Sequence, residues 1–175
     1  MLVYSDPLGH DVGRKIGAQM ATARHVLFLD ADMVISAENL LPFVRSLEEG
    51  AGLVLNNIDP LLPPTSTWDS VSVLKAWLNV ILRRPDLGTA SMTAIPHGIQ
   101  RDLLTPDILE SLSVPPLAYV RLLTKGTSVA MANSVDVISS NRRRAAHGHS
   151  PRSNQIEDLI LGDHVEAMEW LRHGH

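Results

Sequence analysis

Apolar positions along this chain fall into two patterns: short unbroken runs, and longer stretches in which apolar residues return every three or four positions. The first pattern predicts buried strands and the second predicts amphipathic helices. Strands are predicted over residues 2–4, 26–29, 53–55, 90–95, 128–131 and 135–138. Helices are predicted over residues 12–23, 36–47, 67–81, 108–112, 117–125 and 156–171, the last as one helix or a pair. This order predicts an α/β fold with a mixed, mainly parallel sheet flanked by helices.

The segments around these elements add three expectations. Trp77 lies on the apolar stripe of the predicted helix over 67–81, so we expect it in the core. Residues 59–66 contain three prolines and predict a loop. The polar segment 142–155 begins with three arginines and predicts a mobile loop. The length of 175 residues favours a single domain.

Composition narrows the class of protein. Hydrophobic residues make up 45% of the chain but aromatic residues only 4%, so the core must consist mainly of aliphatic side chains. The net charge of −4 provides no field that would attract nucleic acid. The chain has no cysteine, and no apolar run approaches the roughly 20 residues that span a bilayer. We therefore expect a cytoplasmic protein without a transmembrane segment.

Two carboxylates interrupt the most apolar run of the chain. Asp30 and Asp32 follow Leu29 at the end of the predicted strand. Burying an unpaired charge is costly, so these side chains should emerge at the carboxyl end of the strand, where open α/β sheets bind ligands. There they could share Mg²⁺ or Mn²⁺, which prefer oxygen ligands. The alternative is a plain aspartate turn in which Asp32 caps the following helix.

A glycine-rich segment precedes this strand. Gly13 and Gly17 flank Arg14 and Lys15 at the start of the first predicted helix. Glycines allow a ligand to approach the backbone, and a helix start with adjacent cations favours a phosphate. The alternative is that the glycines let the helix pack closely against a strand. A phosphate-binding turn beside a cation-binding pair is the arrangement that a metal-bound diphosphate requires.

The segment from Gly13 to Asp32 resembles the family 2 glycosyltransferases, which have the GT-A fold, a Rossmann-like α/β fold. In that family an arginine-containing helix precedes a strand that ends in a DxD motif, here Asp30-Ala31-Asp32. Residues 84–101 and 114–118 are similar to a bacterial branch of the family, although Lys15 stands where many members have Asn. The resemblance implies a hexosyltransferase that uses a nucleotide-diphosphate sugar, an unknown acceptor, and Mg²⁺ or Mn²⁺ bound by the DxD motif.

The resemblance also implies roles for residues outside this segment. Asp158 resembles the family's catalytic base, and Asp163 is its rival. His97 and Arg101 are candidate acceptor contacts by the same resemblance. Some members add a late histidine to the metal site, and the candidates are His147, His149 and His164.

The resemblance implies that the first βα units, which hold the nucleoside, are missing. Only twelve residues precede Gly13. We therefore expect an N-terminally incomplete domain that binds its donor weakly on its own. Such a domain would leave a sheet edge and apolar surface exposed, which favours a homo-oligomer.

Two other classes of function compete with sugar transfer. An apolar strand followed by Asp-x-Asp also begins the haloacid-dehalogenase-type phosphatases. In such an enzyme Asp30 would be the nucleophile, Lys125 would neutralise charge and Asp163 would bind magnesium. The other alternative is a non-catalytic, transferase-like interaction module.

Overall fold

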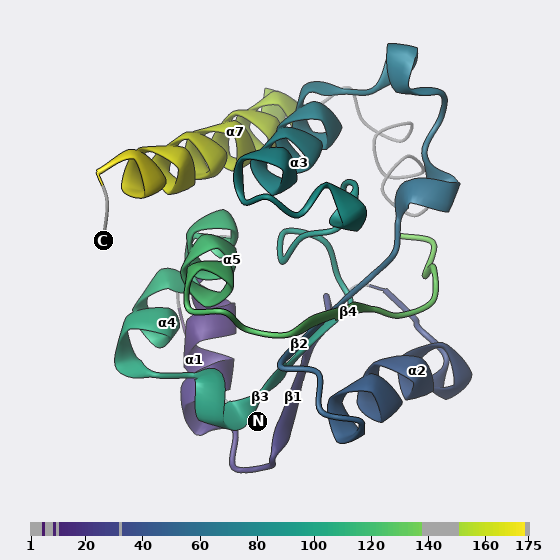
Figure 1. The fold of residues 1–175 in the computed structure, drawn as a ribbon, viewed down its shortest axis with the longest axis vertical. Coiled ribbons are helices and arrows are strands. Elements are labelled where there is room, and N and C mark those ends of the chain that lie inside the picture. Colours follow the sequence, from purple (N-terminus) through teal and green to yellow (C-terminus); the bar gives the residue numbers. More distant parts are fainter. Residues whose placement is uncertain (1–4, 6–8, 10, 32, 138–150, 174–175) are drawn as a thin grey trace.

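A computed structural model of the chain describes residues 5, 9, 11–31, 33–137 and 151–173 (Figure 1). A four-stranded sheet lies between one helix on one face and several helices on the other (Figure 1). The strands are β1 (His25–Phe28), β2 (Leu53–Leu55), β3 (His97–Gln100) and β4 (Val129–Met131). The helices are α1 (Val12–Met20), α2 (Ala37–Glu48), α3 (Ser70–Ile81), α4 (Pro106–Ser111), α5 (Pro115–Thr124) and α7 (Pro151–Arg172). No helix in this part of the chain is long and apolar enough to cross a membrane.

The sheet has the strand order β1-β3-β2-β4. β3 lies between β1 and β2 and runs antiparallel to both, whereas β4 is parallel to β2. The fold is mixed α/β as predicted, but the prediction of a mainly parallel sheet is wrong, because a reversed strand occupies a central position. Phe28 pairs with His97 and His25 pairs with Gln100. The carboxyl ends of β1, β2 and β4 therefore lie beside the start of β3, at what we call the His97 end of the sheet; the other is the Gln100 end.

The strand predicted over 90–95 is a loop instead. Residues 88–96, here called the central loop, contain no strand and are almost entirely buried, and β3 begins directly after Pro96. Gly88 begins this loop with φ +52°, and a Cβ there would lie 1.8 Å from a carboxylate oxygen of Asp59. Only glycine fits this conformation and this contact. The prediction failed because a buried loop and a buried strand have the same apolar composition.

Two hydrophobic clusters hold the sheet between the helices. Leu53 and Leu55 face the larger cluster, which α1, α4 and α5 cover together with Phe28 and Tyr119. Val54 points to the other face, where α2 contributes Phe43 to the smaller cluster. This alternation buries β2 on both faces, so the strand predicted over 53–55 is confirmed, whereas β1, whose apolar run is also typical of a buried strand, lies at the edge of the sheet.

The helix α3 turns its polar side inward. Its buried residues are Ser72, Lys75, Leu78 and Asn79, whereas Trp77 is 56% exposed. The prediction of Trp77 in the core is therefore wrong. The inward polar side chains need partners or ligands, because burial removes them from water. Lys75 and Asn79 are considered below.

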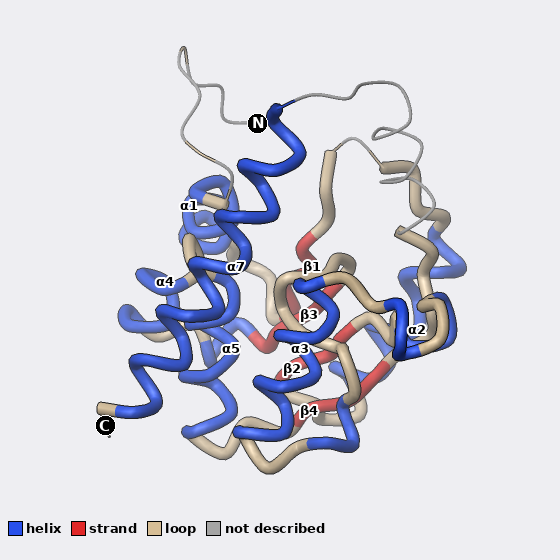
Figure 2. Tube along the Cα trace, turned by 90° about the horizontal axis from the view of Figure 1, so that it is seen from above, coloured by secondary structure: helices blue, strands red, loops and turns tan. Residues whose placement is uncertain are grey.

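The helix α7 is one continuous helix that packs against α3 and α5 (Figure 2). Residues 151–155, which were predicted to belong to a mobile loop, lie in this helix. The rest of that predicted loop, residues 142–150, lies outside the described residues. Because α7 begins at Pro151, Asp158 and Asp163 are interior helix positions. They are not caps of a separate closing helix.

Candidate functional site

Asp30 follows β1 by two residues and lies at the His97 end of the sheet, with an exposed side chain. The amide of Met33 donates a hydrogen bond to the Asp30 carbonyl (3.3 Å), so the chain turns here. Asp32 lies outside the described residues. The N-cap of α2 is Ser36, whose side chain makes no capping hydrogen bond, and Asp32 therefore does not occupy the N-cap position of that helix. The turn thus leaves the Asp30 carboxylate directed to solvent at the expected end of the sheet.

Arg14 connects α1 to the central loop. Its Nη1 donates a hydrogen bond to the carbonyl of Met92 (2.7 Å), and its Nε forms an ion pair with Asp11 (3.0 Å). The side chain is only 15% exposed. These two contacts fix the guanidinium at the His97 end, and its planar fork of five donors suits a phosphate or carboxylate.

The neighbours of Arg14 on α1 are placed differently. Lys15 forms an ion pair with Glu110 of α4 (2.6 Å), so this cation already has an acidic partner. Gly13 and Gly17 are exposed, and a Cβ at either position would meet no atom within 4 Å. The packing alternative for these glycines is therefore wrong. The bare helix surface that they create leaves the backbone open to a ligand.

Side chains from three elements hold the central loop in place. Asn56 follows β2 and is fully buried; it donates hydrogen bonds to the carbonyls of Ile95 and Val135 (2.9 Å each) and accepts one from the Val135 amide (2.8 Å). Asn79 of α3 donates to the carbonyls of Gly88 and Ala90 (2.8 and 2.9 Å). These buried amides substitute for a strand ladder along the loop.

The start of the loop is fixed by a carboxylate. Asp59 accepts hydrogen bonds from both the amide (2.9 Å) and the hydroxyl of Thr89. Asn79 is in turn fixed by Tyr119 of α5, whose hydroxyl donates to its amide oxygen (2.7 Å). The loop is therefore as rigidly positioned as a strand, and it can present side chains such as Thr93 at a defined place.

His97 is buried at the start of β3. Its ring stacks on Phe28 (4.8 Å between ring centroids) and its Nδ1 lies 3.0 Å from the carbonyl of Ala94. Burial, with a smaller contribution from Arg14, lowers the pKa of His97 to about 3, so the ring is neutral at pH 7. Since a carbonyl only accepts, Nδ1 carries the proton and Nε2 is a buried lone pair that has no hydrogen-bond partner among the described residues. The buried hydroxyl of Thr93 likewise has no partner in this part of the chain.

Arg101 lies at the Gln100 end, one strand length from His97. Its Nε donates to the carbonyl of Ala21 (2.7 Å). It lines a cleft of about 770 Å³ together with Arg24, Asp102 and Lys125. The antiparallel direction of β3 causes this separation, because the strand begins beside Asp30 and ends far from it. His97 and Arg101, which the resemblance grouped as acceptor contacts, therefore do not lie at one site.

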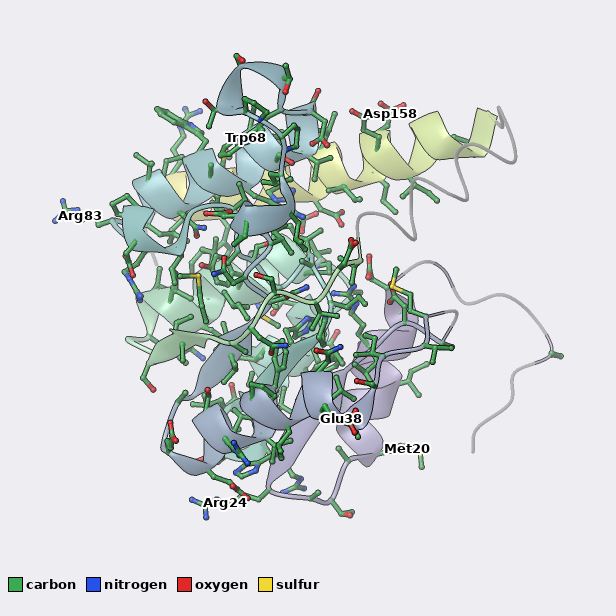
Figure 3. All side chains as sticks on the ribbon, turned by 90° about the vertical axis from the view of Figure 1, so that its right-hand side faces the viewer. Met20, Arg24, Glu38, Trp68, Arg83 and Asp158 are labelled. Carbon is green, nitrogen blue, oxygen red and sulfur yellow. The ribbon has the colours of Figure 1, made fainter. Side chains whose placement is uncertain are left out.

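The helix α7 contributes three candidate residues at different depths. Asp158 is exposed and projects from the side of α7 that faces away from the sheet (Figure 3). Asp163 is half-buried and His164 is fully buried. The Nδ1 of His164 lies 2.7 Å from the carbonyl of Ile160, so its Nε2 is a buried lone pair, and like that of His97 it has no partner within the ranges that the structure describes. His147 and His149 lie outside the described residues.

Lys75 of α3 is the residue that the sequence reasoning missed. It is 9% exposed and makes no hydrogen bond or ion pair with any residue in the described ranges. Burial lowers its pKa to about 8, Asp69 opposes this shift and Arg14 adds to it. The available signal is the polar spacing of Ser72, Lys75 and Asn79 on one side of the helix, but the apolar stripe beside it predicts that a different side faces inward.

One protein family matches the part of the chain that contains this site. A model of glycosyl transferase family 2 matches residues 3–98, more than half of the chain. The chain belongs to glycosyl transferase family 2. Members of this family transfer a sugar from a nucleotide-sugar donor and typically use a divalent metal. No curated protein and no solved structure matches the chain.

The family 2 domain includes Arg14, Asp30, the central loop and the start of β3, so the matched region contains the His97 end of the sheet. The phosphatase alternative disagrees with the structure. Lys125, its charge neutraliser, lies in the cleft at the Gln100 end and forms an ion pair with Asp107 (2.6 Å). It is therefore at the opposite end of the sheet from Asp30.

The described residues supply only some of the ligands that a divalent cation needs. Among them, no group of three or more histidine and carboxylate side chains could hold a metal ion. Asp30 supplies one exposed carboxylate of the kind that Mg²⁺ and Mn²⁺ prefer. His164 fits less well, because the ammonium group of Lys75 acts on its ring and would repel a cation there.

Proposed function

We propose that this chain transfers a hexose from a nucleotide-diphosphate donor to an acceptor hydroxyl at the His97 end of the sheet. The observation that carries the proposal is the convergence of Arg14, Asp30 and the rigid central loop at this end. Asp30 and Asp32 would hold Mg²⁺ or Mn²⁺, which neutralises the diphosphate as it leaves. The cytoplasm, where nucleotide sugars are made available, is the proposed location.

Arg14 positions the donor. Its contacts with Asp11 and Met92 keep the guanidinium in one orientation, so a diphosphate oxygen can bind without ordering a flexible side chain. Lys15 would add charge at the helix start only by leaving Glu110. The exposed backbone at Gly13 and Gly17 allows the phosphates to approach α1.

The acceptor hydroxyl needs a base. Asp158 and Asp163 remain the two candidates, and we favour Asp163, because it is half-buried beside His164 while Asp158 projects outward (Figure 3). His97 is neutral and wholly buried, which suits holding the start of β3 in place. Arg101 would contact only the far end of a long acceptor.

The test is release of nucleoside diphosphate from a panel of nucleotide sugars at millimolar concentration, with and without Mn²⁺. We expect release from at least one donor in the presence of Mn²⁺, and none from Asp30→Asn. Asp158→Asn and Asp163→Asn then identify the base by loss of turnover with donor binding retained. The proposal is wrong if no donor reacts and Mn²⁺ does not bind.

A further inference from the structure

Lys75 is a buried cation whose charge is not neutralised by any described residue. Its side chain lies on the inward face of α3, and no hydrogen bond or ion pair is formed to it within the described ranges. Asp69 is an acid that acts on it and raises its pKa, but the Asp69 carboxylate accepts a hydrogen bond from the Ser72 amide (2.7 Å) and caps α3. Buried ammonium groups are costly without a counter-charge, so an unpaired one is unusual in a structure retained for packing alone.

The groups around Lys75 add positive charge and lone pairs. In addition to burial, the charge of Arg14 on α1 lowers the pKa of Lys75, and in addition to burial the charge of Lys75 lowers the pKa of His164 on α7, a helix that packs directly on α3. Arg14 has its own counter-ion in Asp11. Within the described ranges, the Nε2 atom of His164 is a buried acceptor without a hydrogen-bond partner. The group therefore contains one cation without an ion-pair partner among the described residues, Lys75, and one buried acceptor, His164, and its positive charge disfavours a cationic ligand.

A ligand that satisfies this cluster must carry a negatively charged oxygen. An oxyanion neutralises the ammonium and lies within the influence of Arg14, while a hydroxyl on the same ligand can donate to His164. We propose that Lys75 binds an oxyanion of a substrate, a phosphate or a carboxylate, between α1, α3 and α7. This rests on the proposed function to the extent that the substrate is a donor or an acceptor of sugar transfer.

Two sources of this oxyanion are chemically equivalent at Lys75. One is the diphosphate of the donor, which Arg14 would share. The other is an acidic group on the acceptor. Inorganic pyrophosphate represents the first source, and glycolate, which has one carboxylate and one hydroxyl, represents the second.

The test compares three variants by titration calorimetry with each probe at pH 7. Lys75→Met removes the charge but keeps the length, Lys75→Arg keeps the charge, and Lys125→Met removes an exposed cation at the Gln100 end. We expect Lys75→Met to bind one of the probes at least tenfold more weakly, Lys75→Arg to retain most of the affinity, and Lys125→Met to match the wild type. The probe that is affected identifies the source.

Thermal unfolding separates binding from structure. Lys75→Met should melt at the same or a higher temperature than the wild type, since it replaces an unpaired buried charge with an apolar chain. Equal affinities in the wild type and Lys75→Met, or no binding of either probe to the wild type, would overturn the proposal.

Failure of the proposed oxyanion site can be distinguished from failure of the proposed sugar transfer. Lys75-dependent binding without nucleoside diphosphate release in the donor panel would keep the oxyanion site and reject sugar transfer. Normal transfer by Lys75→Met, together with unchanged probe binding, would keep sugar transfer and reject the oxyanion site.

Discussion

The two ends of β3 differ in how they use polar groups. At the His97 end, buried amides hold the central loop, and the buried hydroxyl of Thr93 and Nε2 of His97 have no hydrogen-bond partner among the described residues. At the Gln100 end, polar side chains line an open cleft and Lys125 pairs with Asp107, and the buried Nε2 of His25 also has no partner in the described ranges. Hydrogen bonds from Lys125 and Thr105 lower the pKa of Asp107 to about 2.

This difference indicates where the chemistry lies. Paired charges at a surface contribute modestly to stability, and they need no ligand because each charge already has a partner. Buried polar atoms without a partner in the described ranges lie at both ends, so the feature that distinguishes the His97 end is that Arg14, Asp30 and the fixed central loop meet there. Matched substitutions at the two ends should therefore have unequal effects.

The largest difference, in the rate of nucleoside diphosphate release, is expected between Asp30→Asn and Asp102→Asn. Asp30 follows β1 at the His97 end, and Asp102 lines the cleft. Loss of the carboxylate that we propose binds the metal should lower Mn²⁺-dependent release of nucleoside diphosphate about a thousandfold. Asp102→Asn should stay within about twofold of the wild type, since exposed substitutions away from a site have small effects. Similar rates for the two variants would remove the distinction between the ends.

The next difference concerns stability. Asn56→Ala removes three buried hydrogen bonds that join the ends of β2, the central loop and the segment after β4. We expect the free energy of unfolding to fall by about 3 kcal/mol, measured by urea denaturation. Ser128→Ala, which removes bonds to Gly52 and Gly50 at the other end, should cost about 1 kcal/mol or less. A larger loss for Ser128→Ala would reverse the comparison.

A smaller difference, in pyrophosphate affinity, is expected between variants of Arg14 and Arg101. Arg14→Met should weaken pyrophosphate binding about tenfold, because it removes a charge-assisted bond worth roughly 1.5 kcal/mol or more. Arg101→Met, which loses a bond to the Ala21 carbonyl at the Gln100 end, should leave that affinity unchanged. Calorimetry measures both, and circular dichroism confirms that each variant is folded. Equal weakening by both variants would argue for a diffuse charge effect.

The smallest effect, counted per pH unit, is expected in the pH dependence of the free energy of unfolding. Burial lowers the pKa of His97 to about 3, whereas the unfolded chain titrates near 6.5. Between these values the unfolded chain binds more protons, so stability falls as the pH falls, by about 1 kcal/mol per pH unit below pH 6. His97→Phe should flatten this slope in urea titrations at pH 7, 6 and 5. An unchanged slope would mean that His164, whose pKa burial also lowers, or other groups account for it.

Local patterns predicted the elements better than their arrangement. The helix predicted from Ser36 and the strand over 53–55 are confirmed because helical spacing and apolar runs act within a few residues. The central loop was predicted as a strand because residues 90–95 are mostly apolar and buried, but the carbonyls of Ala90 and Ile95 accept hydrogen bonds from Asn79 and Asn56 rather than from a neighbouring strand. The reversed β3 could not be predicted either, because strand order depends on contacts between distant segments.

The candidate site was likewise predictable only where it depends on residues close together in the sequence. The glycine-rich helix start and Asp30 follow each other closely in sequence, so their placement at one end was predictable. The separation of His97 from Arg101 follows from strand direction, and Lys75 was missed because the sequence does not say which side of α3 faces inward.

The central claim is that a metal-dependent site lies at the His97 end, and paramagnetic broadening by Mn²⁺ tests it most directly. In amide spectra of the ¹⁵N-labelled protein, substoichiometric Mn²⁺ should broaden the signals of Asp30, Met33 and Thr93. Those of Gly52 and Gly126, which line the cleft at the Gln100 end, should stay sharp. Broadening at Gly52 and Gly126 instead, or at neither end, would contradict the account.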